Sequence, residues 1–217
     1  IEEAGGPKYK YLNIDPSMNE DGGQPDANIR VGFLYNPKRV QFDKSIESGD
    51  ADTAVSYKDG DLTLNPGRID PNNPAFDDSR KPLAAQFKFH GEQVIVLANH
   101  WNSKNGDTPL FGSQQPPVLE SENQRVEIAK SVGRFVEQVQ KDNPNANIVS
   151  VGDYNDFQWS KPLKTFESFN MSNMIYDLPE SERYSYNYQG NSQALDHIFV
   201  SNNLKNHTEL DPIHVNS

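Results

Sequence analysis

Three short polar clusters carry side chains that could do chemistry, and each lies at the end of an apolar run. They are Asn99-His100, Asp153-Tyr154-Asn155 and Asp196-His197. An imidazole and carboxylates can move protons or orient water, and carboxylate and amide oxygens are ligands that hard divalent cations prefer. Asp153 and Asn155 are two residues apart, so on an extended segment both side chains point the same way and can share a cation or a phosphate oxygen.

Each cluster also has a purely structural explanation. A Gly-Asp-x-Asn sequence after a strand is often only a turn, because Asp and Asn cap their own backbone. His100 could be a strand-end histidine bonded to a carbonyl, and Asp196 could cap a turn before a strand. The chemical interpretation depends on finding all three clusters in one chain, since strand ends can converge on one rim of a sheet.

Apolar runs predict the strands that would position these clusters. Residues 83–90 alternate in polarity, Gly91-Glu92 makes a turn, and residues 93–98 are almost all apolar. This pattern predicts a β-hairpin whose second strand is buried and ends at Asn99-His100. Further strands are predicted at residues 9–14, 29–35, 147–151 and 198–200, and the order of strands around one long helix indicates a mixed α/β domain.

The helix is predicted to begin at Ser121. Ser121 and Gln124 have the spacing of a capping box. Apolar residues then recur at intervals of three and four, which gives one core-facing stripe made of Val126, Ala129, Val132, Val136 and Val139.

The composition limits how the clusters could be used. The chain has 217 residues, which suits one domain, and it has no cysteine. Any metal must therefore be held by oxygen or imidazole ligands, and disulfides are excluded. The net charge of -11 argues against a protein that grips nucleic acid through a broad basic surface. No apolar run is long enough to span a membrane, and no signal peptide opens the chain.

Five stretches, taken in order, resemble a known family. They are Asn28 to Pro37, Ser79 to Leu83, Asn99 to Lys104, Val151 to Phe157 and Leu195 to Val200. The chain from Tyr9 onward resembles the endonuclease/exonuclease/phosphatase (DNase I-like) superfamily. It is most similar to the bacterial extracellular nuclease branch, in which a segment like Gly22 to Pro25 occurs. The resemblance implies an α/β (α+β) fold, a four-layer α/β/β/α sandwich, with residues 1–217 forming one domain.

The resemblance also implies roles for the clusters. His100 would be one of two active-site histidines and would stabilise or protonate the scissile phosphate. Asp153 and Asn155 would serve the metal and the phosphate, the carboxylate holding the cation and the amide donating to a non-bridging oxygen. Asp196 would orient the second histidine and help polarise the attacking water.

Two further residues are expected to contact the substrate. Arg80 would bind the substrate phosphate near the cleft, and Asn99 is also expected to bind the substrate. The implied reaction is in-line attack by water on a phosphodiester of DNA or RNA, with Mg²⁺, Mn²⁺ or Ca²⁺ neutralising the developing charge. Such a cation would also supply positive charge that the acidic chain lacks. The branch resemblance implies a secreted or cell-surface bacterial protein.

Two parts of the family pattern are not found in this sequence. Residues 1–6 resemble the tail of the helix that follows the family's early metal-binding glutamate. The chain stops at Ser217, before a Ser-Asp-His-x-Pro segment with the second catalytic histidine, and His214 is a poor substitute. We therefore expect the sandwich to lack its N-terminal strand and helix and its C-terminal strand, and this chain alone to be weak or inactive.

Other functions share the same residues. A phospholipid or sugar-phosphate phosphodiesterase of the same superfamily would use the same core, and a non-catalytic secreted binding module could retain the fold. Tyr184, Tyr186 and Tyr188 have strand periodicity, for which a half-buried strand face is favoured over base stacking. Tyr154 is expected to pack inward with a partner for its hydroxyl, and His197 has no assigned role.

Overall fold

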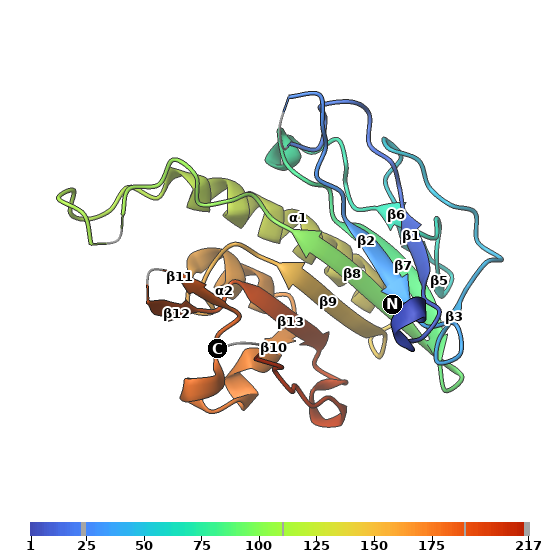
Figure 1. The fold of residues 1–217 in the computed structure, drawn as a ribbon. Coiled ribbons are helices and arrows are strands. Elements are labelled where there is room, and N and C mark those ends of the chain that lie inside the picture. Colours follow the sequence, from blue (N-terminus) through green and yellow to red (C-terminus); the bar gives the residue numbers. More distant parts are fainter. Residues whose placement is uncertain (23–24, 110, 189, 215–217) are drawn as a thin grey trace.

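The computed structural model describes residues 1–22, 25–109, 111–188 and 190–214, and within them one mixed seven-stranded sheet dominates (Figure 1). Neighbouring strands are antiparallel except for one parallel pair, β8 and β9. The strands lie in the order β10 (Met171–Asn173), β13 (Asp196–Ser201), β9 (Asn147–Asp153), β8 (Glu92–His100), β7 (Leu83–Phe89) and β3 (Gln41–Phe42), with β6 (Gly67–Arg68) also paired to β7.

The predicted hairpin and the strands that follow it are confirmed. β7 and β8 pair along their whole length through the turn at His90-Gly91. The helix α1 (Glu120–Asp142) then crosses over and returns the chain as β9, parallel to β8. Because parallel strands end at the same edge of a sheet, the carboxyl ends of β8 and β9 lie together. β13 runs antiparallel to β9 and begins at that edge.

α1 packs against one face of the sheet with the predicted apolar stripe, all of which is buried. Its predicted start was wrong. The helix begins at Glu120, and no side chain caps it at Leu119. Ser121 instead bonds Asp107 of the preceding loop through both its backbone N–H (2.9 Å) and its hydroxyl (2.6 Å). Gln124 donates to the carbonyls of residues 75 and 77, so the capping box does not form.

The opposite face of the sheet is covered by the small sheet of β1 (Lys10–Asn13) and β2 (Gly32–Tyr35), which lies over β7 (Figure 1). These two strands are shorter than the predicted runs. Phe33 and Tyr35 pack edge-on against Phe87 and form a second core separate from that under α1. The described residues therefore build three layers, helices, main sheet and small sheet, so the predicted four-layer sandwich is present only in part.

The remaining elements are short. α2 (Lys161–Glu167) packs beside α1, and the other strands form two-stranded ribbons. Among the described residues no helix is long and apolar enough to cross a membrane. Two residues of the Gly22 to Pro25 segment lie outside the described residues. The short elements are β4 (Tyr57–Lys58), β5 (Asp61–Leu62), β11 (Tyr186–Tyr188), β12 (Asn191–Gln193) and the 3₁₀ turns η1 (Glu2–Ala4), η2 (Pro74–Phe76), η3 (Met174–Asp177), η4 (Glu180–Glu182) and η5 (Lys205–His207).

Gly152 permits the close approach of β8 and β9 just before Asp153. Its φ of 138° lies in a region that L side chains rarely adopt. A Cβ at this position would lie 1.9 Å from the carbonyl oxygen of Asn99, its partner on β8. The backbone at the end of β9 therefore tolerates only glycine.

We expect Gly152→Ala to lower the free energy of unfolding by at least about 3 kcal/mol, because the strain in φ and the backbone clash act together. Urea denaturation measures the change. Gly91→Ala is the matched control: Gly91 also has a positive φ of 87°, but a Cβ there meets nothing within 4 Å. It should cost only about 1 kcal/mol. Equal losses from the two substitutions would contradict the close-approach explanation.

Candidate active site at the ends of β8, β9 and β13

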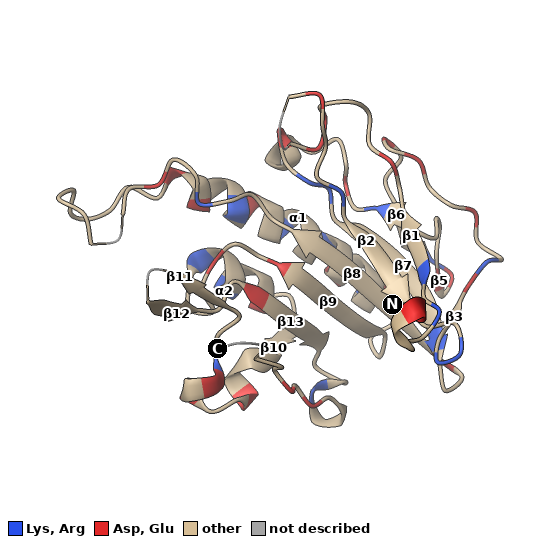
Figure 2. Ribbon diagram, in the orientation of Figure 1, with Lys and Arg blue, Asp and Glu red and all other residues tan. Residues whose placement is uncertain are grey.

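The sheet brings three of the predicted residues into one row. His100 of β8 is the register partner of Asp153 on β9, and Asp153 is the register partner of Asp196 on β13. Figure 2 shows acidic residues in red at the neighbouring ends of β9 and β13. His100 Nε2 lies 3.7 Å from Asp153 Oδ2. The expected convergence of the three clusters on one rim is thus confirmed for one residue of each.

Asn155 lies in the turn that was the structural alternative for this motif, and not on an extended segment. Its φ is 51°, so residues 153–155 form a turn and not an extended segment. The backbone N–H of Asn155 donates to Asp153 Oδ1 at 2.7 Å, as in the turn explanation for this motif. The amide nitrogen of Asn155 donates to the carbonyl oxygen of Trp101 at 2.9 Å. The turn and the chemical interpretation are therefore compatible.

The main chain of Trp101 holds the surrounding residues in place. Its N–H donates to the carbonyl oxygen of Asp153 at 2.9 Å, which extends the pairing of β8 and β9 by one bond. Its carbonyl oxygen accepts from Asn155 and also from Arg80 Nη2 at 2.5 Å. Arg80 is only 8% exposed, and its Nε is buried without a hydrogen-bond partner. The Arg80 guanidinium, with one unused N–H donor, is thus fixed beside the carboxylates.

Burial and neighbouring charge keep His100 neutral. Burial lowers the pKa of this imidazole most, the Arg80 guanidinium lowers it further, and Asp196 opposes both, which leaves a pKa of about 4. The ring is therefore uncharged at pH 7 in the free protein. A neutral histidine at a polar rim can accept a proton or a hydrogen bond, and it gains positive charge only when an anion binds beside it.

Asp153 and Asp196 form a pair of like charges across two strands. Burial raises the pKa of Asp153, and the charge of Asp196 adds to this effect. The hydrogen bond from the Asn155 N–H and the charge of Arg80 oppose it. The Asp153 side chain is half-buried and Asp196 is exposed. A cation placed between the two side chains would favour the ionised form of Asp153.

Two other residues with sequence predictions, Asn99 and Tyr154, lie on the core side of the sheet. Asn99 is 4% exposed and its amide bonds Ser150 Oγ at 2.9 Å, while its oxygen accepts from the Trp101 indole at 3.1 Å. Because successive strand residues face opposite sides, Asn99 points away from His100. This geometry does not support the predicted substrate contact and makes Asn99 a positioning residue instead. Tyr154 is fully buried, as predicted, and its hydroxyl lies 2.7 Å from Ser150 Oγ.

His197 also has a structural place. It is 3% exposed, and its Nε2 lies 2.9 Å from the carbonyl oxygen of Asp156, while its Nδ1 lies 3.1 Å from the Asn173 amide. Burial lowers its pKa, and the bond to the Asp156 carbonyl opposes this. The neutral Nε2–H tautomer fits both contacts. His197 therefore ties the β9 loop to β13 beneath Asp196.

A buried charge network under the rim was not predicted. Asp156 accepts from Lys104 Nζ at 2.6 Å and from Arg125 Nε at 2.9 Å, and Arg125 is fully buried. The network joins the loop after β8, helix α1 and the loop after β9. Asp156 and Lys104 lie in stretches that resemble the family, but Arg125 directly precedes Val126 of the apolar stripe on α1 and looks like an ordinary surface position in the sequence.

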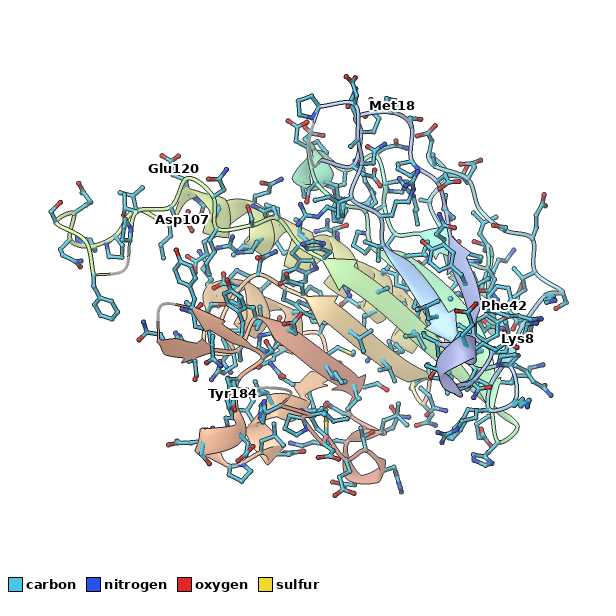
Figure 3. All side chains as sticks on the ribbon, in the orientation of Figure 1. Lys8, Met18, Phe42, Asp107, Glu120 and Tyr184 are labelled. Atoms are coloured by element: carbon cyan, nitrogen blue, oxygen red, sulfur yellow. The ribbon has the colours of Figure 1, made fainter. Side chains whose placement is uncertain are left out.

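The tyrosine run 184–188 is not a half-buried strand face, so the favoured prediction was wrong. Tyr186 and Tyr188 are 47% and 50% exposed, and their rings stack at a centroid distance of 6.1 Å. Tyr184, labelled in Figure 3, stacks on His214 at 3.9 Å. His214 also pairs with Glu182 at 3.2 Å, so it has local partners of its own.

Comparison with known proteins agrees with this arrangement. A sequence profile described as "Endonuclease/Exonuclease/phosphatase family" matches residues 29–214, most of the chain. The chain belongs to this family. No curated protein sequence matches it.

Several solved structures share the fold at low sequence identity. A humanized D. rerio TDP2 has 15% identity and a TM-score of 0.52, and covers 89% of this chain and 60% of its own. The human nocturnin catalytic domain with bound sulfate has 13% identity, a TM-score of 0.52 and the same coverages. A Bacteroides vulgatus family protein has 17% identity and a TM-score of 0.50, with coverages of 92% and 67%. The chain thus spans about 60% of the length of the first two.

The donor set in the row was tested against the divalent cation that this family implies. Among the described residues no three His, Asp or Glu side chains gather into a ligand set. Asp153 and Asp196 nevertheless oppose each other on adjacent strands. Mg²⁺ is commonly bound through one or two carboxylates together with water and substrate phosphate. The pair fits such a cation. The bond to the Trp101 carbonyl uses the amide nitrogen of Asn155, so its amide oxygen is the atom that would serve the predicted ligation.

The cause of the low His100 pKa can be tested directly. We expect Arg80→Gln to raise the pKa of His100 above about 4, because one of the two lowering effects is removed while burial remains. Arg80→Lys keeps a positive charge and should leave the pKa low. NMR titration of the imidazole C–H, assigned with His100→Ala, measures both. An unchanged midpoint in Arg80→Gln would mean that burial alone sets the value.

Proposed function

We propose that this chain is the catalytic region of a divalent-metal-dependent phosphodiesterase whose substrate is DNA or RNA. The observation that carries the proposal is the row of His100, Asp153 and Asp196 with Arg80 fixed beside it. The buried Nε of Arg80 without a partner points to an anion, since a buried charged donor is costly when left unused. We place the protein in the secreted bacterial nuclease branch on its sequence resemblance.

Phosphate oxygens would be bound by Arg80 and Asn155. One nitrogen of each side chain donates to the Trp101 carbonyl, so both side chains are already oriented before a substrate arrives. Arg80 retains Nε, and an amide group has a second N–H, for non-bridging oxygens. Prior orientation reduces the entropy lost when a phosphodiester is bound.

Proton transfer would involve His100 and Asp196. When water attacks phosphorus, a new P–O bond forms, and the proton of the attacking water can pass to the exposed Asp196 carboxylate. The P–O ester bond on the opposite side breaks, and the departing oxygen takes a proton. A bound phosphodiester raises the pKa of the neutral His100, which can then supply that proton or a hydrogen bond to a non-bridging oxygen.

Asp153 and Asp196 would hold the divalent cation, which when bound neutralises negative charge that develops on the phosphate. Local positive charge of this kind is needed because the chain has a net charge of -11. Figure 2 shows its Lys and Arg residues dispersed over many elements and not gathered in one stripe. Binding of nucleic acid would therefore depend on contacts at the site and not on a basic groove along the surface.

The substrate class rests on the branch resemblance and on one relative. A D. rerio TDP2 complexed with single-strand DNA product has 15% identity to this chain and a TM-score of 0.50. Identity at that level establishes the fold alone. Phospholipid and sugar-phosphate diesters are consistent with the same row of residues, and they are the other substrates to compare.

The proposal is tested by hydrolysis of supercoiled plasmid, single-stranded RNA and bis(p-nitrophenyl) phosphate by the chain and by any longer natural form of it. We expect cleavage with Mg²⁺ or Mn²⁺ that stops in EDTA. His100→Ala and Asp153→Asn should each lower kcat by about 10²-fold or more, because each removes a group that touches the phosphate or the cation.

Matched controls separate these effects from general damage. His207→Ala removes an exposed histidine, and Asp59→Asn removes an exposed carboxylate at a turn; both should retain full activity. Cleavage that survives His100→Ala and Asp153→Asn would place the chemistry elsewhere. If no form cleaves any phosphodiester with any of these metals, the chain is a binding module and the proposal fails.

A further inference from the structure

Four aromatic rings, three exposed and one half-buried, lie on two elements that adjoin the strand ends of the row. Phe157 and Trp159, in the loop after β9, stack with nearly parallel rings, at a centroid distance of 5.1 Å and an interplanar angle of 16°. Tyr186 and Tyr188 of β11 also lie at 16°, with centroids 6.1 Å apart. We refer to these four residues as the aromatic rim.

Both elements are bonded directly to the strand ends that carry the carboxylates. Phe157 follows Asp156, whose carbonyl oxygen is bonded by His197 next to Asp196. On the other element, the hydroxyl oxygen of Ser185 accepts from the backbone N–H of Asp196 at 3.1 Å, and Ser185 precedes Tyr186. The aromatic rim is thus attached to the ends of β9 and β13.

Core packing does not account for the exposure of Trp159. Trp159 is 64% exposed, whereas the only other tryptophan, Trp101, is 1% exposed in the core. Large apolar groups exposed to water on a fixed scaffold are typical of recognition surfaces. The scaffold here includes Lys104, whose Nζ lies 4.7 Å from the centroid of Phe157 and 2.6 Å from Asp156 Oδ1.

We propose that the aromatic rim stacks on the bases of a single-stranded nucleic acid segment adjoining the scissile phosphate. This inference rests on the proposed nuclease function and names how its substrate is recognised. Bases present flat faces that stack on exposed rings whatever their sequence. An acidic chain has little general attraction for a polyanion, so ring faces supply affinity that phosphate contacts cannot.

Nucleobases suit this surface better than sugars do. A sugar site needs hydrogen-bonding side chains that converge on ring hydroxyls, whereas this surface presents two pairs of stacked ring faces. Ring pairs on two elements match successive bases of a single strand.

Trp159 provides its own probe, because it is the one tryptophan of the two that solvent can reach. The full chain is titrated in EDTA at low ionic strength with an oligothymidylate of about 12 nucleotides, and the tryptophan emission is recorded. We expect quenching of the solvent-exposed emission component. An oligomer of equal length with abasic sites has the same phosphates but no bases, and it should quench little.

Substitutions locate the contact. With a labelled oligothymidylate followed by anisotropy, Trp159→Ala and the double substitution Tyr186→Ala/Tyr188→Ala should each raise Kd by roughly 5- to 100-fold, as expected for the loss of stacking on one base. Tyr11→Ala removes a ring that is 55% exposed on the small sheet and should leave Kd unchanged. Circular dichroism confirms that each variant is folded.

The outcomes separate this inference from the proposed function. Equal quenching by the abasic oligomer, or stronger quenching by an oligosaccharide, would overturn base stacking even if the chain cleaves phosphodiesters. An unchanged Kd in both aromatic variants would also overturn it. Specific, base-dependent binding without any hydrolysis would support the aromatic rim while the catalytic proposal fails.

Discussion

The pairing of the Trp101 main chain with β9 is the constraint on which the site depends. One N–H reaches the Asp153 carbonyl, and one carbonyl receives both Arg80 and Asn155. The indole is anchored in the core by ring contacts with Tyr154 and Phe166. The backbone at Trp101 therefore cannot shift without repacking that core. Core packing thus fixes the positions of Asp153, Arg80 and Asn155, which are bonded to this backbone.

Strand direction accounts for the rest of the arrangement. The helical crossover makes β8 and β9 parallel, so His100 and Asp153 end side by side, and the antiparallel β13 begins opposite them with Asp196. Gly152 allows the backbones to approach at that level. The network of Arg125 and Lys104 with Asp156 and Asp107 balances two positive charges with two negative ones, and the separate charge of Arg80 acts on the pKa of Asp153.

Local sequence patterns predicted the secondary-structure elements that depend on local interactions. The β7–β8 hairpin, the buried stripe of α1 and the strand before Asp153 follow from periodicity and turn residues. Long-range contacts decided the remainder. The start of α1 depends on Asp107, a loop residue, and the orientation of the Asn155 amide depends on the carbonyl oxygen of Trp101. Such contacts leave no pattern in one sequence. Asn99 was expected to contact the substrate, but the alternation of side chains along β8 turns it inward.

The titration of the histidines connects stability to function. Both His100 and His197 have lowered pKa values in the folded chain, so the unfolded chain binds more protons as the pH falls below about 6.5. Their neutral forms therefore stabilise the fold at pH 7, and this contribution is lost on acidification. His197 is enclosed, whereas His100 stands at the rim. A bound anion can therefore contact His100 and favour its protonation, but it cannot contact His197. The same burial that disfavours a charged His100 in the free protein thus makes its protonation depend on bound phosphate.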